Sequence, residues 1–191
     1  MDEEELEELL EGLIETPAKE FKGSCQWAVG TFVKDILAMS NERNGGRIIV
    51  GVEECSDVSF TRVGVQTAAR DSYVPDLMKD QVGPFADPYV QFNVYFPTDR
   101  DGREYVVIEV LPFDEDPVIC KKSHHDVCEG RLYYRGKGRR PESSAVSNSS
   151  SLREILRRAS AKKIRIYKEL GFDIAETDVV KARLDKELDG L

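Results

Sequence analysis

The sequence lacks the long apolar runs of a membrane protein and the basic start of a secretory signal. Its longest apolar stretches, such as RIIVGV at residues 47–52, are far shorter than the roughly 20 residues that span a bilayer. The first residues, MDEEELEELLEGL, are acidic, whereas a secretory signal begins with positive charge. These absences predict a cytoplasmic protein without a membrane partner, and in that compartment the four cysteines are expected to be reduced thiols.

The sequence also has no internal repeat and no phosphate-binding loop. Gly45 and Gly46 are not followed by the lysine and the serine or threonine of a Walker motif, so no nucleotide cofactor is expected. The length of 191 residues and the hydrophobic content of 40% are typical of one globular domain with its own core.

Charge is unevenly distributed along the chain, whose formal net charge is -9. Residues 121–168 contain 14 of the 27 Lys and Arg but only 4 of the 36 acids, a local charge of +10 that leaves -19 elsewhere. Such asymmetry favours a face that binds a polyanion. The alternative is that these cations lie on solvated surfaces and do not gather in space.

Hydrophobic periodicity predicts an α+β fold. Helical spacing indicates helices over residues 3–14, 29–37, 74–82 and 177–189, and Ser151 with Glu154 forms a capping box that opens a further helix. The expected strands are AKEFK, RIIVGVEE, YVQFNVYF, EYVVIEVL, PVICK and RLYYRGK, and ESSAVSNSSS is expected to be a loop. We predict a mixed or antiparallel sheet of five or six strands with helices on one side and a helical C-terminal extension.

The stretch IETPAKEFKG at residues 14–23 places two acids and a lysine around a proline. Pro17 ends the first helix because the residue before a proline is pushed out of the helical region. In the strand that follows, alternate side chains share a face, so Glu20 and Lys22 point together while Phe21 points into the core.

Several stretches together resemble the Schlafen AlbA-type domain family. They are Glu15 to Lys22 as E-x4-EFK, then AMSNERNGGRIIVGVEE, and later PVICKK and YYRGKGRRP, all in the family's order. The family usually has two aspartates where this chain has Glu53 and Glu54, and a turn before the paired glycines that is one residue shorter. The resemblance covers residues 15 to about 158, so the expected organisation is an N-terminal helix at 1–14, the AlbA-like domain at 15–158 and a helical extension at 159–191.

The resemblance also implies a three-carboxylate site like that of the ribonuclease Schlafens. The matching residues are Glu15, Glu20 and Glu54, which would ligate Mg²⁺ or Mn²⁺ through carboxylate oxygens. Such a cation activates water and stabilises charge on a phosphate, and Lys22 would neutralise a phosphoryl oxygen. The alternative is that Glu15 ends a helix, Glu20 pairs with a neighbouring cation and Glu54 is an exposed turn acid.

Basic residues interleaved with tyrosines are candidates for contact with nucleic acid, because phosphates attract cations and bases stack on aromatic rings. Arg135 is the foremost of these, since it matches the arginine of the family's Tyr-x-Arg segment. The full set of nucleic-acid-binding candidates is Lys22, Arg47, Lys121, Lys122, Tyr134, Arg135, Lys137, Arg139 and Arg140.

Both histidines of the chain lie within nine residues, in the pattern Cys120-x3-His124-His125-x2-Cys128. Thiolates and imidazoles bind zinc. This spacing matches no established zinc motif, and four ligands on one tight hairpin would be cramped. A hairpin flanked by two cysteines is therefore favoured over a zinc site.

Three functions remain open from the sequence. The first is a divalent-metal-dependent endoribonuclease acting on tRNA or another structured RNA. It would work as a homodimer, because the Schlafen core resembles two such lobes forming a clamp. The second is a non-catalytic module that binds DNA or RNA for regulation. The third is an interaction subunit of a larger defence or regulatory complex.

Overall fold

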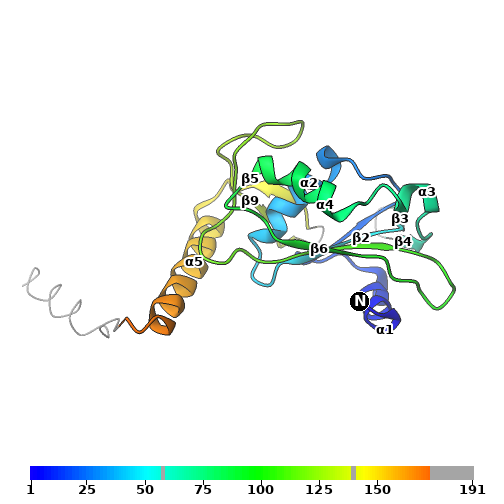
Figure 1. The fold of residues 1–191 in the computed structure, drawn as a ribbon, viewed down its shortest axis with the longest axis horizontal. Coiled ribbons are helices and arrows are strands. Elements are labelled where there is room, and N and C mark those ends of the chain that lie inside the picture. Colours follow the sequence, from blue (N-terminus) through cyan, green and yellow to red (C-terminus); the bar gives the residue numbers. More distant parts are fainter. Residues whose placement is uncertain (57–58, 139–140, 173–191) are drawn as a thin grey trace, which may run out of the picture.

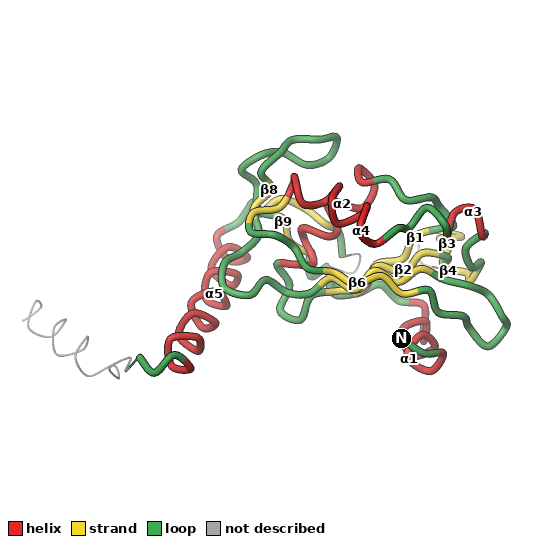
Figure 2. Tube along the Cα trace, in the orientation of Figure 1, coloured by secondary structure: helices red, strands yellow, loops and turns green. Residues whose placement is uncertain are grey.

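A computed structural model of the protein describes residues 1–56, 59–138 and 141–172. Its helical elements are α1 (Glu3–Leu10), η1 (Glu11–Leu13), α2 (Val29–Ser40), α3 (Thr67–Arg70), α4 (Pro75–Val82), η2 (Gly83–Phe85) and α5 (Ser149–Glu169). Its strands are β1 (Lys19–Lys22), β2 (Gly46–Val50), β3 (Val52–Ser56), β4 (Ser59–Arg62), β5 (Ala86–Asp87), β6 (Phe92–Tyr95), β7 (Val106–Val110), β8 (Ile119–Cys120), β9 (Tyr133–Arg135) and β10 (Ser143–Ala145). Figure 2 shows how these helices and strands follow one another along the trace.

A four-stranded mixed sheet in the order β1-β2-β7-β6 forms the centre of the fold. The edge strand β1 runs parallel to β2, with Glu20 opposite Ile48, whereas the other two pairings are antiparallel. Smaller two-stranded sheets join β3 to β4, β5 to β8, and β9 to β10. The α+β class with a mixed sheet is confirmed, although the central sheet has four strands and the remaining strands form separate pairs.

Helices cover both faces of this sheet, which corrects the expectation of helices on one side. In Figure 1, α2 and α4 lie above the sheet and α1 lies below it. On the α1 face, Leu6 and Leu10 are fully buried against Phe21 and Ile49. Each such leucine contributes about 1.5–3 kcal/mol. The N-terminal helix is therefore part of the core.

The α2 face carries the larger core, in which Phe32 and Ile36 pack with Ile48 and Val50. The alternation predicted for β1 follows from this arrangement, because Phe21 enters the α1 core while Glu20 and Lys22 face α2. The same strand thus anchors one helix with its apolar side chain and leaves two charged side chains on the other face.

The stretch RIIVGVEE does not form a single strand, because Gly51 separates β2 from β3. Gly51 has a φ of 111° and a Cβ there would lie 2.9 Å from the Tyr105 ring, so only glycine fits. The chain bends at this point, and Glu54 is carried on the β3–β4 hairpin instead of the end of the central sheet.

Three other local predictions also differ from the structure. The serine-rich stretch includes β10, which pairs with β9, so it is only partly a loop. Helix α5 begins at Ser149 and is capped by Asn148, whose side chain accepts the Ser151 N–H, so the predicted capping box at Ser151 is wrong. PVICK and RLYYRGK are joined by the single bridge Ile119–Leu132 and by the hydrogen bond that the Cys120 N–H donates to the Arg131 carbonyl, while β8 and β9 pair mainly with β5 and β10.

Helix α5 crosses the predicted boundary between residues 158 and 159 and extends away from the domain in Figure 1. Its inner half is anchored by the buried Ile155 and Ala159. The helix predicted at 177–189 lies outside the described residues. Within the residues that the structure describes, no helix is long and apolar enough to cross a membrane.

Candidate active-site pocket

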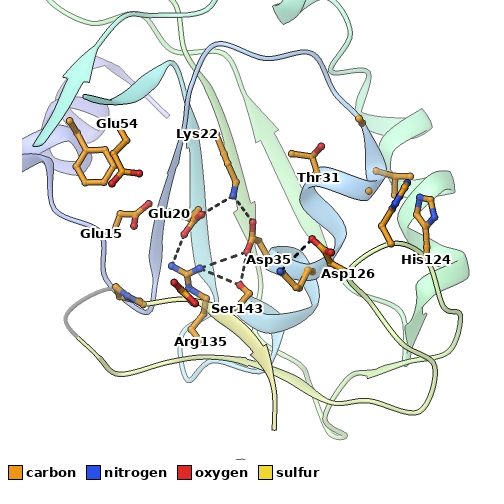
Figure 3. Close-up of a pocket in the computed structure, with 18 of the residues that line it drawn as sticks. Glu15, Glu20, Lys22, Thr31, Asp35, Glu54, His124, Asp126, Arg135 and Ser143 are labelled. Atoms are coloured by element: carbon orange, nitrogen blue, oxygen red, sulfur yellow. Dashed lines mark hydrogen bonds and ion pairs between the residues drawn. The ribbon is translucent and has the colours of Figure 1, made fainter. Parts of the chain in front are cut away.

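A pocket of about 880 Å³ is lined by β1, the start of α2, β3, β9, β10 and the turn at residues 124–126. Five residues that the sequence singled out are brought together in its wall: Glu15, Glu20, Lys22, Glu54 and Arg135. Figure 3 shows Glu15, Glu20 and Glu54 at one end of this pocket and His124 at the other. We call these the acid end and the imidazole end.

The acid end contains a closed network of charged and polar groups. Lys22 Nζ lies 2.8 Å from Glu20 Oε1 and 2.9 Å from Asp35 Oδ2. Arg135 Nη2 lies 2.7 Å from Glu20 Oε2, and its Nη1 is 3.7 Å from Asp35 Oδ1. Ser143 Oγ accepts from Arg135 Nη1 at 3.2 Å and donates to Asp35 Oδ1 at 2.6 Å. Two cations therefore balance two carboxylates inside the protein.

Because these charged side chains are buried, the network is stable only when every cation and carboxylate in it is present. Arg135 is 1% exposed and Asp35 is 5% exposed, so neither charge is screened by bulk water. The ion pair between Arg135 Nη2 and Glu20 is poorly aligned as a hydrogen bond, and Nη2 and Nε are buried without an aligned acceptor in the described chain. Burial alone would lower the pKa of Lys22, but the Asp35 and Glu20 carboxylates outweigh it and raise that pKa above its ordinary value.

Glu15 and Glu54 complete the acid end from two other segments. Glu15 Oε1 accepts a hydrogen bond from the Phe21 backbone N–H at 2.9 Å. Burial raises the pKa of the Glu15 carboxyl above its ordinary value, and this hydrogen bond offsets only part of the effect. Glu54 is exposed on β3 and lines the same pocket.

The arrangement of these acids does not fit a divalent cation. Each oxygen of Glu20 already has a protein cation within 2.8 Å, and Asp35 is held by the same two cations. A metal ion would have to displace Lys22 or Arg135 to reach those oxygens. In the parts of the chain that the structure describes, no group of three or more His, Cys, Asp or Glu is placed to hold a metal ion.

The imidazole end is built on a tight turn. His124 and Val127 exchange two backbone hydrogen bonds of 2.9 and 2.8 Å, and His125 has a φ of 41°. The two imidazole rings lie 4.4 Å apart between centroids, and His124 stacks on Phe85 at 5.7 Å. Lys34, on α2, lies at the same end of the pocket, 3.7 Å from Asp126.

The other nucleic-acid candidates lie outside this pocket. Arg47 is on the α1 face of the sheet, paired with Glu109 at 2.7 Å. Tyr134 is half-buried and lines a smaller pocket with Lys137, which pairs with Glu154 at 2.7 Å. Lys121 and Lys122 are exposed beside the turn that carries His124. Arg139 and Arg140 are outside the described residues.

Sequence reasoning missed Asp35 and Ser143. Asp35 is the only acid in α2, where it lies among the buried Phe32, Val33 and Ile36, so an acid inside an apolar helical stripe was the available signal. Ser143 gave no such signal because it lies in a serine-rich stretch. Both residues matter here because they connect α2 and β10 to Arg135.

The two cysteines that flank the imidazoles lie in different environments. Cys120 is buried and its thiol donates to the Lys122 carbonyl oxygen, whereas Cys128 is exposed. All four cysteines are free thiols. Tyr133 closes this loop by accepting the Cys128 N–H on its hydroxyl oxygen at 2.9 Å.

Residues 15–142 match the family model described as Schlafen, AlbA_2, which covers the acid end, the imidazole end and Arg135. Two solved structures are also similar. The DIP2311 protein from Corynebacterium diphtheriae is 16% identical over 72% of this chain and 23% of its own, with a TM-score of 0.45. The N-terminal domain of a RecG-related protein from Nitrosomonas europaea, described as related to an ATP-dependent DNA helicase, is 17% identical over 65% and 83%, with a TM-score of 0.46. This chain thus spans about a quarter of the first of these proteins. No curated protein matches it significantly.

Proposed function

The chain belongs to the Schlafen AlbA_2 family, and we propose that it is a nucleic-acid-binding domain whose pocket takes a strand of RNA or DNA. The observation that carries the proposal is the convergence of Glu15, Glu20, Lys22, Glu54 and Arg135 in one pocket of about 880 Å³. A pocket of this size accommodates a nucleotide-sized ligand.

The basic part of the chain supports a polyanionic ligand. Lys121, Lys122 and Arg131 are exposed and make no ion pair with another described residue. Exposed cations without carboxylate partners attract phosphates and release counterions when they bind them. Lys121 and Lys122 lie just before the 124–126 turn in sequence, so they add two exposed cations beside the imidazole end of the pocket.

A second candidate is endoribonuclease activity on tRNA or another structured RNA, and the acid end favours it. Burial raises the pKa of Glu15, so this carboxyl holds its proton more firmly than an exposed glutamate and suits proton transfer better. Lys22, whose side chain is 24% exposed and is held by Glu20 and Asp35, is the cation of the acid end that we assign to negative charge developing on a phosphate. Because the carboxylates as arranged do not fit Mg²⁺ or Mn²⁺, no step is assigned to a metal.

A cleavage assay separates these readings. Labelled tRNA, structured RNA and DNA are incubated with the protein in Mg²⁺, in Mn²⁺ and in EDTA, and binding is followed in parallel. Endoribonuclease activity requires cleavage that Glu15→Gln and Glu20→Gln abolish while binding survives. Binding without cleavage under all three conditions leaves a regulatory module. If the protein neither binds nor cuts at low salt, an interaction subunit is the remaining reading.

The partner expected of a single lobe is a second copy of this chain. The outer half of α5 exposes Ile164 and Tyr167, and the turn that follows it exposes Leu170 and Phe172. Apolar side chains of this size on a projecting helix are typical of an association surface. Light scattering across a concentration series tests this, with a dimeric mass as the expected result and a monomer at all concentrations as the contrary one.

A further inference from the structure

His124 lies at the end of the pocket opposite Glu15 and Glu54 (Figure 3), and the ring of His125 lies beside it, 4.4 Å away between centroids. Neither histidine belongs to the charge network of the acid end that is described above. His124 is half-buried and His125 is exposed, so both rings are in the pocket wall and open to a ligand.

Several contacts hold the imidazoles in place without a ligand. The backbone bonds between His124 and Val127 fix the turn, and Phe85 supports the His124 ring. The rings lie directly over the first turn of α2, where a Cβ on Gly30 would lie 3.2 Å from His125 Cδ2 and 3.3 Å from His124 Nε2. A glycine at this position gives both rings the room to approach α2.

The charged groups around the imidazoles have a positive balance. Lys34 faces them from α2, and Lys122 lies 5.6 Å from the Phe85 ring on which His124 stacks. Asp126, on the same turn, is the one acid of the 124–126 turn and pairs with Lys34 at 3.7 Å. Lys34 (+1), Lys122 (+1) and Asp126 (-1) together carry a formal charge of +1.

We propose that His124, His125 and Lys34 form a phosphate-binding subsite that takes a backbone phosphate of the strand bound in this pocket. The inference rests on the proposed nucleic-acid binding and names a second contact point, away from the acid end. An imidazolium donates from both ring nitrogens and a lysine donates three hydrogens, which matches the acceptor oxygens of a phosphodiester.

A phosphate suits this subsite better than the other ligands of imidazoles. A metal ion would be repelled by Lys34, and no described acid other than Asp126 is on the turn to balance it. A nucleobase cannot stack on the face of His124 that packs against Phe85, where the two rings are 29° from parallel. An anion, by contrast, is favoured by every cation present, and each imidazole that carries a proton adds to this attraction.

The test is the affinity for a fluorescein-labelled single-stranded RNA of twelve nucleotides, measured by anisotropy at pH 5.5 and 7.5. The wild type is compared with a His124→Gln/His125→Asn double variant, in which asparagine tolerates the positive φ of His125. Lys137→Gln, outside the pocket, is the control for loss of a cation. Acids that titrate over this range act equally on all three proteins, and circular dichroism verifies their folding.

The subsite predicts that the wild type binds at least about tenfold more tightly at pH 5.5 than at pH 7.5, and that the control keeps this ratio. In the double variant the ratio falls below about threefold. The salt slope of the wild type steepens by at most about 0.7 on acidification, since the subsite neutralises one phosphate and each phosphate neutralised adds about 0.7 for a single strand. Equal pH ratios in the wild type and double variant overturn the subsite but leave the proposed function standing. No binding by the wild type at either pH, in low salt, overturns the proposed function itself.

Discussion

The two ends of the pocket use charge in opposite ways. At the acid end, Glu20 and Asp35 are matched by Lys22 and Arg135, and the charges cancel within the protein. At the imidazole end, two histidines and a lysine face the pocket with one carboxylate, Asp126, on the same turn. The network of the acid end pairs its charges within the protein, whereas the subsite that we propose at the imidazole end pairs its cations with a bound phosphate.

This difference shows that acids gathered in one pocket can already be paired with cations of the protein. The sequence pattern correctly suggests that Glu15, Glu20 and Glu54 lie near one another, but the cations that lie beside them decide what they do. A buried carboxylate that already has two protein cations is a fixed part of the fold. An exposed imidazole on a stiff turn contributes little to the fold and remains available to a ligand.

The substitution from which we expect the largest change tests whether the charge network of the acid end stabilises the fold. Arg135→Met removes a buried cation and leaves Glu20 and Asp35 with only Lys22 between them. Loss of one partner of a buried ion pair costs about 3–5 kcal/mol, and we expect a loss of that size in urea unfolding at pH 7. The matched control Lys137→Met breaks an exposed ion pair with Glu154 and should cost less than about 1 kcal/mol. Similar losses in both variants would remove the distinction between a buried network and a surface pair.

A substitution of Lys22, with a smaller expected change in stability, tests whether the acid end can be converted into a metal site. Lys22→Met leaves excess negative charge between Glu20 and Asp35, and we expect a loss of about 1–3 kcal/mol together with a rise in melting temperature on adding Mn²⁺. Because the pKa of Lys22 is raised, its stabilisation is fully present below its unfolded value near 10.5 and is lost only as pH rises beyond that. The difference between variant and wild type should therefore be constant between pH 6 and 9. A wild type that Mn²⁺ stabilises as strongly as the variant would show that Lys22 does not block the metal.

For Glu15 we expect a substitution to increase the free energy of unfolding, in contrast to the losses expected for Arg135 and Lys22. Its folded-state pKa is raised by burial, so between the unfolded value of 4.5 and that higher value the folded state keeps a proton that the unfolded state has lost. Stability therefore falls as pH rises through this window, and the buried charge destabilises the fold above it. Glu15→Gln keeps the acceptor for the Phe21 N–H and should be more stable than the wild type at pH 7, with no difference below about pH 4. A less stable variant at pH 7 would mean that the carboxylate is held by an attraction larger than its burial cost.

The smallest expected effect is at the imidazole end. His125→Asn changes an exposed side chain on a turn whose positive φ asparagine accepts, so unfolding free energy should change by less than about 0.5 kcal/mol. Thermal and urea unfolding of this variant measure it. A loss above 1 kcal/mol would place His125 with the structural residues and weaken the contrast between the two ends.

Much of the site follows from local sequence pattern. The alternation of Glu20, Phe21 and Lys22 fixed which side chains share a face, because the period of a strand is two and Phe21 had to enter a core. Gly51 shows the limit of such patterns. The apolar run on either side of it reads as one strand, and only the close approach of Tyr105 and Gly64 reveals that the chain must bend there.

The partners of buried charges were beyond local reasoning. Arg135 is inward-facing on β9 like Tyr133, and a charge at such a position makes sense only with Glu20 and Asp35 beside it. Those acids are more than 90 residues away in sequence, so no window of the chain contains both halves of the network. The sequence identifies the two histidines only as possible zinc ligands. Their position over Gly30 could not be predicted, because it depends on how the turn meets α2.

Whether a nucleic-acid strand occupies this pocket can be measured by a heteronuclear NMR titration with a short single-stranded RNA at low salt. We expect amide shifts to gather at residues 29–35 and 124–126, on both sides of the imidazole end, with smaller shifts at 15–22. Shifts confined to α5, or none at saturating RNA, would contradict it.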